Sequence, residues 1–196
     1  MRKLILQMQT SIDGFVGRTD DGPSWQVWDW GPEPRWTKAL LDRFNRFFVE
    51  ADTILLSRKI VKGGYIDHWT EMASRFPKES AFAFAHRILA MQKVVFSESG
   101  KTVNAVGVEM AAGPLAKEVA ALKRKRGGNI VAFGGAGFAA ALIAEGLVDE
   151  YQFYVNAVAL HDGLRVFRDG RDARFSLIEA TGYDCGVTVT RYSPER

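Results

Sequence analysis

Residues 130–138 read IVAFGGAGF, and this segment says most about how the chain folds. Its four leading apolar residues predict a strand buried on both faces, and the glycine-rich turn after them leads into an apolar helix predicted at 139–147. Such a junction leaves backbone N–H groups and the positive end of the helix facing whatever lies above the turn. The segment therefore predicts a phosphate site at the turn, and the alternative is a tight turn without a ligand.

Three other short apolar runs precede this segment, at residues 4–6, 54–56 and 94–96. Because these runs are continuous rather than alternating, they predict strands that are covered on both faces. Apolar residues spaced three to four apart predict helices between them, the first after Pro34. Strands and helices thus alternate along this part of the chain.

The last third of the sequence has a different character. Residues 151–160 predict one long strand with no helix after it, and alternating patterns at 177–180 and 187–192 predict two further strands around a turn at 184–186. The whole sequence therefore predicts a single α/β domain over residues 1–196, with a mixed sheet flanked by helices and an antiparallel C-terminal hairpin.

The composition is that of an ordinary globular protein: of 196 residues, 47% are apolar and 25% charged, and the net charge is +3. This balance excludes a disordered or collagen-like chain and gives no sign of a nucleic-acid partner. The single cysteine excludes an internal disulfide, and the three histidines lack metal-ligand spacing, so we expect no metal. No apolar run is long enough for a signal peptide or a membrane span, which predicts a cytoplasmic protein without a membrane partner.

Basic residues cluster at two places in the sequence, one at a predicted helix start and one at a predicted helix end, and we interpret the two clusters differently. Arg58 and Lys59 follow Ser57 at the expected start of a helix, where the dipole disfavours cations, so a bound phosphate would explain them as well as plain solvation would. The run KRKR at 123–126 ends a predicted helix, where cations are favoured, and we interpret it as a solvated helix end rather than a nucleic-acid patch. Another strand end leads into Ser97, in a polar loop that could border an adenosine.

The sequence shows no recognisable catalytic motif. The catalytic residues are therefore unknown, and Asp13 and Glu33 are candidates only because they are the acids near the segments interpreted as functional. Trp25, Trp28 and Trp30 lie in a loop bounded by glycine and proline, where they could stack on a planar substrate or cover the core.

Three stretches of the sequence carry a resemblance to a known family. They are LQMQTSIDGFVG at 6–17, DTILLSRK at 52–59 and FGGAGFAAALIAEGLVDEYQFYVNAVAL at 133–160. The chain resembles the dihydrofolate reductase-like superfamily, and specifically the reductase domain of riboflavin biosynthesis, the RibD C-terminal type. The resemblance implies an NADPH-dependent oxidoreductase, often a homodimer, that acts on a small molecule. A pteridine or a ribosylaminopyrimidine such as 5-amino-6-(5-phosphoribosylamino)uracil is the implied substrate.

The resemblance also implies a set of cofactor-binding residues. It places a cis peptide bond between Gly134 and Gly135, over the cofactor. Glu98 stands where many relatives carry a cation, so NADH is not excluded as the cofactor. The other residues implied are Gln9 and Val16 beside the nicotinamide, Ser57, Arg58 and Lys59 with the helix-start amides of Ala136, Gly137 and Phe138 at the phosphates, and Ser97 at the 2′-phosphate.

Three functions of different classes are compatible with these patterns. The first is a nicotinamide-dependent reductase, which the resemblance favours. The second is a dinucleotide-binding protein without turnover, acting as a sensor or a partner subunit. The third is an interaction module that uses the basic loops and binds no nucleotide.

Overall fold

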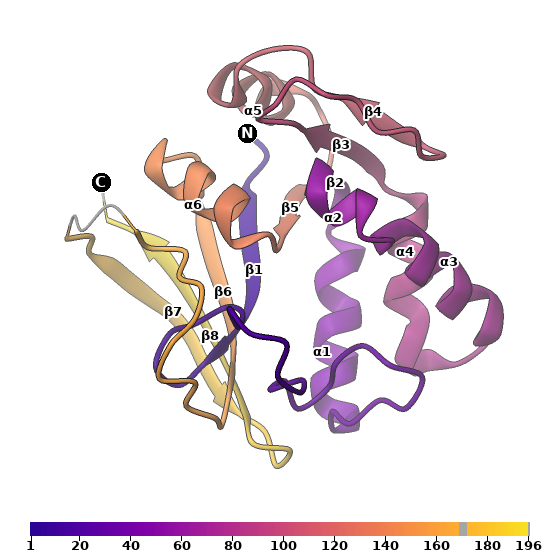
Figure 1. Cartoon of the computed structure of the whole chain (residues 1–196), viewed down its shortest axis with the longest axis vertical. Coiled ribbons are helices and arrows are strands. Elements are labelled where there is room, and N and C mark those ends of the chain that lie inside the picture. The colour runs from indigo at the N-terminus through magenta and orange to yellow at the C-terminus, as the bar shows by residue number, and fades with distance from the viewer. Residues whose placement is uncertain (169–171, 196) are drawn as a thin grey trace.

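The computed structural model describes residues 1–168 and 172–195, which fold around one eight-stranded sheet (Figure 1). The strand order is β4-β3-β2-β5-β1-β6-β8-β7. The first six strands run in the same direction, and they are β1 (Leu4–Ser11), β2 (Ala51–Ser57), β3 (Gln92–Phe96), β4 (Val108–Met110), β5 (Asn129–Phe133) and β6 (Glu150–Asn156). Antiparallel pairing adds β8 (Val187–Pro194) to β6, and β7 (Phe175–Gly182) to β8. The predicted mixed sheet with an antiparallel C-terminal hairpin is confirmed.

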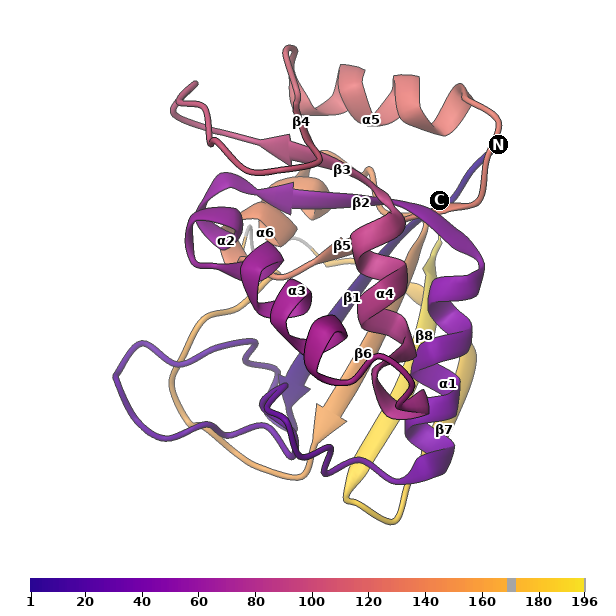
Figure 2. The same ribbon diagram turned by 90° about the vertical axis from the view of Figure 1, so that its right-hand side faces the viewer.

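Helices cover both faces of the parallel part of the sheet (Figure 2). They are α1 (Lys38–Val49), α2 (Arg58–Lys62), α3 (Tyr65–Arg75), the short 3-10 helix η1 (Ser80–Phe82), α4 (Ala83–Ala90), α5 (Leu115–Arg124) and α6 (Ala136–Ala144). One face packs against α1, α3 and α4, and the other against α5 and α6. Because both faces are covered, all eight residues of β1 are buried. In the part of the chain that the structure describes, no helix combines the length and apolar character needed to cross a bilayer.

Aromatic rings make up much of the core beside α1. Phe44 of α1 contacts Trp36, Phe84 and Tyr154, with ring centroids between 4.9 and 5.7 Å apart. Trp28 is fully buried and meets Phe84 edge-on at 6.0 Å. Trp28 therefore covers the core, which was one of the two alternatives that the sequence left open for this loop.

The long strand predicted before the C-terminal hairpin and the helix predicted after the glycine turn have other bounds in the structure. The strand predicted at 151–160 ends at Asn156, because the chain then leaves the sheet to pair with the loop after β1, where the Ile12 N–H donates to the Val158 carbonyl over 2.9 Å. The helix predicted at 139–147 begins at Ala136, directly after the glycine turn, and ends before Gly146. That glycine has φ +64, a conformation that terminates helices.

The interpretation of the basic run as solvated is wrong for Lys123. Its side chain is only 10% exposed, and its ammonium group lies 2.5 Å from the Asp149 carboxylate. The same group donates to the Leu147 carbonyl over 2.6 Å. Lys123 thus joins the end of α5 to the segment that leads into β6. Because a buried ammonium group is costly without a partner, its pairing with the carboxylate is what allows it to be buried.

Candidate functional site

The parallel strands bring the predicted junctions to one edge of the sheet. β3, β2, β5 and β1 are consecutive and parallel, so their carboxyl ends lie side by side. Ser97 follows β3, Ser57 ends β2 and Gly134 follows β5. A Cβ atom added at Gly135 would lie 3.1 Å from Ser57 Oγ, so the glycine turn and the start of α2 are in close contact. This edge is where open α/β sheets bind their ligands.

The turn between β5 and α6 has a backbone suited to glycine. Gly134 and Gly135 have φ values of +41° and +73°, in the left-handed region. The peptide bond between them is trans, so the implied cis bond is wrong, and two positive φ values make the turn instead. No side chain caps α6, which leaves the first N–H groups of the helix, at 136–138, free of an intrahelical partner.

The start of α2 faces this turn and carries the two cations. Ser57 Oγ accepts from the Ile60 N–H over 3.3 Å and so caps the helix. Among the residues that the structure describes, no hydrogen bond or ion pair involves the Arg58 or Lys59 side chain. Ser97, at the end of the adjacent strand, lies with its Oγ 3.4 Å from Ser99 Oγ. The cations are therefore available to an anion at this edge.

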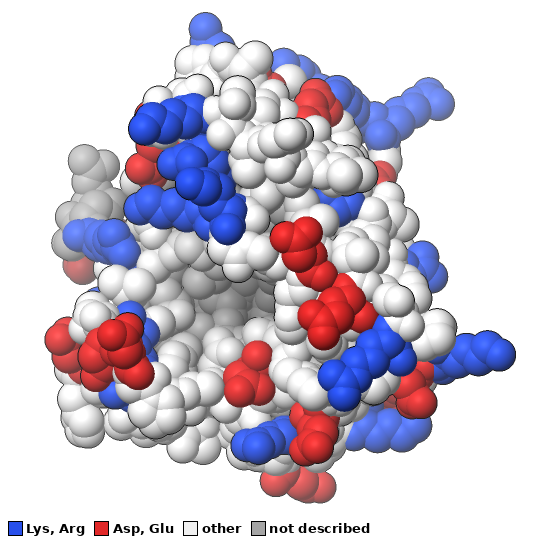
Figure 3. All heavy atoms as spheres, turned by 45° about the vertical axis from the view of Figure 1, so that its right-hand side comes forward, with Lys and Arg blue, Asp and Glu red and all other residues white. Residues whose placement is uncertain are grey.

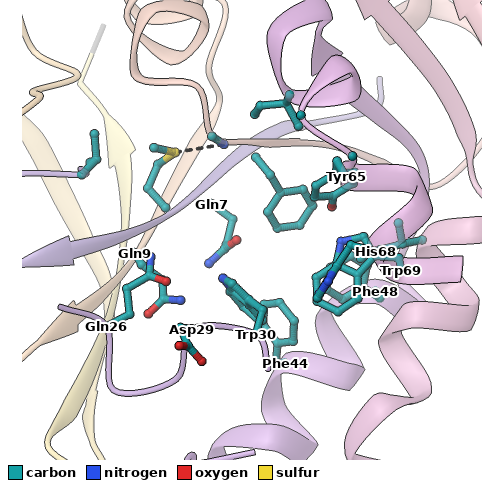
Figure 4. A pocket seen from close by; sticks show the side chains of 18 residues that line it. Gln7, Gln9, Gln26, Asp29, Trp30, Phe44, Phe48, Tyr65, His68 and Trp69 are labelled. Atoms are coloured by element: carbon teal, nitrogen blue, oxygen red, sulfur yellow. Dashed lines mark hydrogen bonds between the residues drawn. The ribbon is translucent and has the colours of Figure 1, made fainter. Parts of the chain in front are cut away.

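Beside these junctions lies a cavity of about 550 Å³, shown from close by in Figure 4. In the space-filling view of Figure 3 the molecule is hollowed on one face, and Lys and Arg side chains gather above the hollow. The cavity is lined by Gln7, Met8, Gln9, Val16, Gln26, Asp29, Trp30, Phe44, Phe48, Ile60, Gly63, Gly64, Tyr65, His68, Trp69, Ile88, Phe133 and Gly134.

The cavity has a polar and an aromatic side. Gln7, Gln9, Gln26 and Asp29 lie on one side, and the rings from α1 and α3 lie on the other (Figure 4). The side chain of Gln9 is fixed because its Oε1 accepts from Asn156 Nδ2 over 3.1 Å and its Nε2 donates to the Trp28 carbonyl over 3.4 Å. A mostly apolar cavity with a few fixed polar groups is the usual form of a small-molecule site.

Tyr65 and His68 are two titratable groups that α3 places at the cavity. Burial raises the pKa of the Tyr65 phenol far above its ordinary value, so this hydroxyl stays neutral at physiological pH. The His68 ring meets the Trp69 ring at a centroid distance of 4.6 Å, and its Nε2 is buried without a partner among the described residues. Both groups can therefore offer a hydrogen bond to a neutral ligand.

The two acids proposed from the sequence lie away from the cavity lining. Asp13 receives a hydrogen bond from Ser11 Oγ at 2.5 Å and from the N–H groups of Leu160 and His161 at 3.1 and 2.8 Å. The Ser11 hydroxyl, followed by these backbone N–H groups, lowers the pKa of Asp13 to about 2. Asp13 thus clamps the loop after β1 to the loop after β6, and Glu33 is exposed.

Some of the residues implied by the resemblance line the cavity, together with residues that the sequence did not predict. Gln9, Val16 and Gly134 line the cavity. The polar residue Gln7 was missed, although two glutamines at alternate positions of a strand that begins with three apolar residues are a detectable signal. The residues of α3 were missed as well, because the short helices at 58–75 have no long apolar pattern.

Comparison with known proteins gives matches over almost the whole chain. The RibD C-terminal domain family matches residues 2–189. The uncharacterized protein YyaP of Bacillus subtilis (strain 168) is 24% identical over 193 residues, which are 97% of this chain and 94% of that protein.

Solved structures share the fold. A pyrimidine reductase-like protein from Corynebacterium diphtheriae superposes with a TM-score of 0.64 at 15% identity, over 100% of this chain and 92% of the other. RibD from Acinetobacter baumannii superposes with a TM-score of 0.68 at 16% identity. This chain is covered fully in that comparison but spans only 59% of the Acinetobacter chain.

Proposed function

The chain belongs to the RibD C-terminal domain family, and on that premise we propose that it is an NADPH-dependent reductase of a small nitrogen heterocycle, with NADH as a possible second cofactor. The observation that supports this function best is the alignment of the glycine turn, the start of α2 and the cavity along one edge of the parallel sheet. We propose pteridines and ribosylaminopyrimidines as the two candidate substrate classes.

The residues present fit a dinucleotide. The uncapped start of α6 offers backbone N–H groups, and Arg58 and Lys59 offer positive charge without an ion partner among the described residues. A pyrophosphate bound there would use both. In this proposal Ser97, which follows the adjacent strand β3, would contact the adenosine end, and Gln9 and Val16, which line the cavity, would contact the nicotinamide.

The chain's own part in the reaction is to orient the reactants and to exclude water. When bound, a reduced nicotinamide supplies the hydride. Gln9, held by Asn156 and the Trp28 carbonyl, fixes one wall of the cavity. The rings of Trp30 and Phe44, whose centroids lie 5.4 Å apart, would form an apolar wall against which a planar substrate could be oriented. The His68 ring, which lines the cavity, would pass a proton to the reduced substrate. The Tyr65 hydroxyl, whose pKa is raised by burial, would donate a hydrogen bond without losing its proton.

Separate titrations with NADPH and NADH, followed by calorimetry, test this proposal. We expect Arg58→Ala to weaken NADPH binding by about 1.5–3 kcal/mol, the range for a charge-assisted hydrogen bond. Arg87→Ala is the matched control, because Arg87 is exposed on α4 and does not line the cavity. Absence of binding for both nucleotides would contradict the proposal. Binding without oxidation of NADPH by any tested heterocycle would instead support a dinucleotide-binding protein without turnover.

A further inference from the structure

Asn156 is a fully buried polar residue at the end of β6, so its side-chain amide needs hydrogen-bond partners within the protein. Its Oδ1 accepts from the Val27 N–H over 2.8 Å, and its Nδ2 donates to Gln9 Oε1 over 3.1 Å. The same Nδ2 lies 3.1 Å from the Tyr154 carbonyl oxygen and 3.3 Å from the Thr10 carbonyl oxygen. Both ends of the amide are therefore satisfied, and a buried polar group that is fully satisfied is held rigidly.

The hydrogen bonds of Asn156 and Gln9 close into a ring with the backbone of Val27 and Trp28. Gln9 Nε2 donates to the Trp28 carbonyl over 3.4 Å, and a peptide bond joins Trp28 to Val27. The ring has one direction, because the Val27 N–H can only donate and the Trp28 carbonyl can only accept. Turning over either side-chain amide would place two donors or two acceptors against each other. The backbone thus fixes which atom of Gln9 faces Asn156 and which faces Trp28.

The partners of Asn156 belong to the wall of the cavity, although Asn156 is not among the described residues that line it. Gln9 lines the cavity directly, and the loop of residues 26–30 lines it through Gln26, Asp29 and Trp30 (Figure 4). In the proposed reductase, Gln9 is on the side of the nicotinamide and Trp30 is in the wall that orients the substrate. Asn156 therefore holds a group on the cofactor side and a segment on the substrate side. A displacement of about 1 Å between two reactants can cost on the order of a hundredfold in rate.

We propose that Asn156 is a positioning residue of the reductase, which sets the Gln9 amide and the loop of residues 26–30 relative to each other through this ring. The inference rests on the proposed function and adds to it a residue that acts through its neighbours on the cavity wall. An asparagine with a purely structural role would stabilise the fold without changing the rate of the bound complex.

Asn156→Ala opens the ring and tests the inference. NADPH oxidation is followed with 5-amino-6-(5-phosphoribosylamino)uracil as the substrate, and with dihydrofolate in its place if that compound is not reduced. We expect kcat to fall at least tenfold, because the two walls lose their fixed relation. The Kd of NADPH in a calorimetric titration should stay within threefold, because the phosphate contacts proposed at α2 and α6 are untouched. A smaller fall in kcat, or a larger change in Kd, overturns the inference.

Gln152→Ala is the matched control, because it removes another buried amide from the same strand. Gln152 is 2% exposed, donates to Tyr154 Oη over 2.8 Å and is not among the described residues that line the cavity. We expect the midpoint of thermal unfolding to fall in this variant while kcat stays within threefold of the parent value. A larger loss of kcat would assign the effect of Asn156→Ala to a general loss of stability and would overturn the positioning role.

Val27→Pro breaks the ring from the other side and decides the question if Asn156→Ala does not fold. It removes the N–H that Asn156 accepts, in a loop that is only partly buried. The same fall in kcat is expected, again with the Kd of NADPH within threefold. Ser24→Pro is its control, because Ser24 is exposed in the same loop and its N–H donates no hydrogen bond within the described part of the chain. Equal values of kcat in the two proline variants overturn the inference.

Amide hydrogen exchange keeps the positioning role distinct from the reductase function. If NADPH does not bind to the parent protein, or neither compound is reduced, the ring is judged without turnover. We expect the Val27 N–H of the parent protein to exchange at least a hundredfold more slowly than in an unfolded chain, and this protection to be lost in the Asn156→Ala protein. An unprotected Val27 N–H in the parent protein, or protection that persists in the variant, overturns the inference whatever the protein binds.

Discussion

At the scale of single residues, Asp13 is a carboxylate outside the cavity lining that holds two loops together through hydrogen bonds from backbone N–H groups. Its oxygens accept from Ser11 Oγ and from two backbone N–H groups after β6, so it joins the loop after β1, which borders the cavity, to the loop after β6. The charge of Asp13 is favoured by these donors rather than by a cation. The Asp13 carboxylate thus has a structural role in holding the loop. Because its pKa is lowered, it is ionised at neutral pH and has no proton to donate there.

The pKa of Asp13 predicts a specific dependence of stability on pH. Because this pKa is lowered in the folded protein from 3.8 to about 2, its contribution is present above about pH 4 and is lost as the pH falls toward 2. Asp13→Asn should lower the free energy of unfolding at pH 7, and the difference from the parent protein should shrink between pH 4 and pH 2. Urea unfolding of both proteins at several pH values measures this. A difference that does not change with pH would contradict the assigned cause.

Single residues of the site were only partly predictable. Gln9 and Val16 came from the resemblance, and Gly134 from the strand, turn and helix pattern that any anion site of this kind uses. His68 and Trp69 reach the cavity because α3 packs on the same face of the sheet as α1, and no local pattern of the sequence encodes that packing. Asp29 and Trp30 belong to a loop without periodicity, so only the folded chain shows that they face the cavity.

At the scale of elements, strands were easier to predict than helices. Burial on both faces leaves a continuous apolar run for each central strand, and those runs marked β1, β2, β3 and β5. α2 has five residues and is separated from α3 by Gly63 and Gly64, so the apolar spacing of this region is interrupted. The strand β4 has three residues and is half-buried, which gives no recognisable pattern either.

The glycine turn between β5 and α6 can be tested with a substitution that adds a single methyl group. Gly135→Ala places a Cβ atom 3.1 Å from Ser57 Oγ on a backbone with φ +73°. We expect the free energy of unfolding to fall by about 1–2 kcal/mol, the cost of a left-handed conformation for a residue with a Cβ. NADPH affinity should fall at least tenfold, because the turn must move away from α2.

Gly182→Ala is the matched control for this substitution. Gly182 lies in β7, where an added Cβ meets no atom within 4 Å and φ lies outside the left-handed region. Calorimetric titration and urea unfolding of the two variants measure both effects. Unchanged NADPH affinity in the Gly135→Ala protein would remove the glycine turn from the nucleotide site.

At the scale of the whole molecule, the sheet ends in a strand that leaves apolar side chains in solvent. β7 pairs only with β8 in the described part of the chain, so its other edge has free backbone groups. Leu177 and Ile178 of this strand are 60% and 45% exposed. Unpaired edges and exposed apolar residues favour association with another chain. The exposed edge at β7 is therefore a candidate contact surface for the homodimer that the resemblance implies.

We therefore expect two copies of the chain to associate through β7. Light scattering at micromolar concentration should give twice the chain mass of 21.8 kDa. Leu177→Lys should shift the mass toward that of one chain, because a charge on the contact face must lose its hydration on association. Val106→Lys is the control, because Val106 is 92% exposed and lies before β4, at the opposite end of the sheet. A parent protein of single-chain mass would contradict the dimer, and a Leu177→Lys protein that still has the double mass would place its contact on another face.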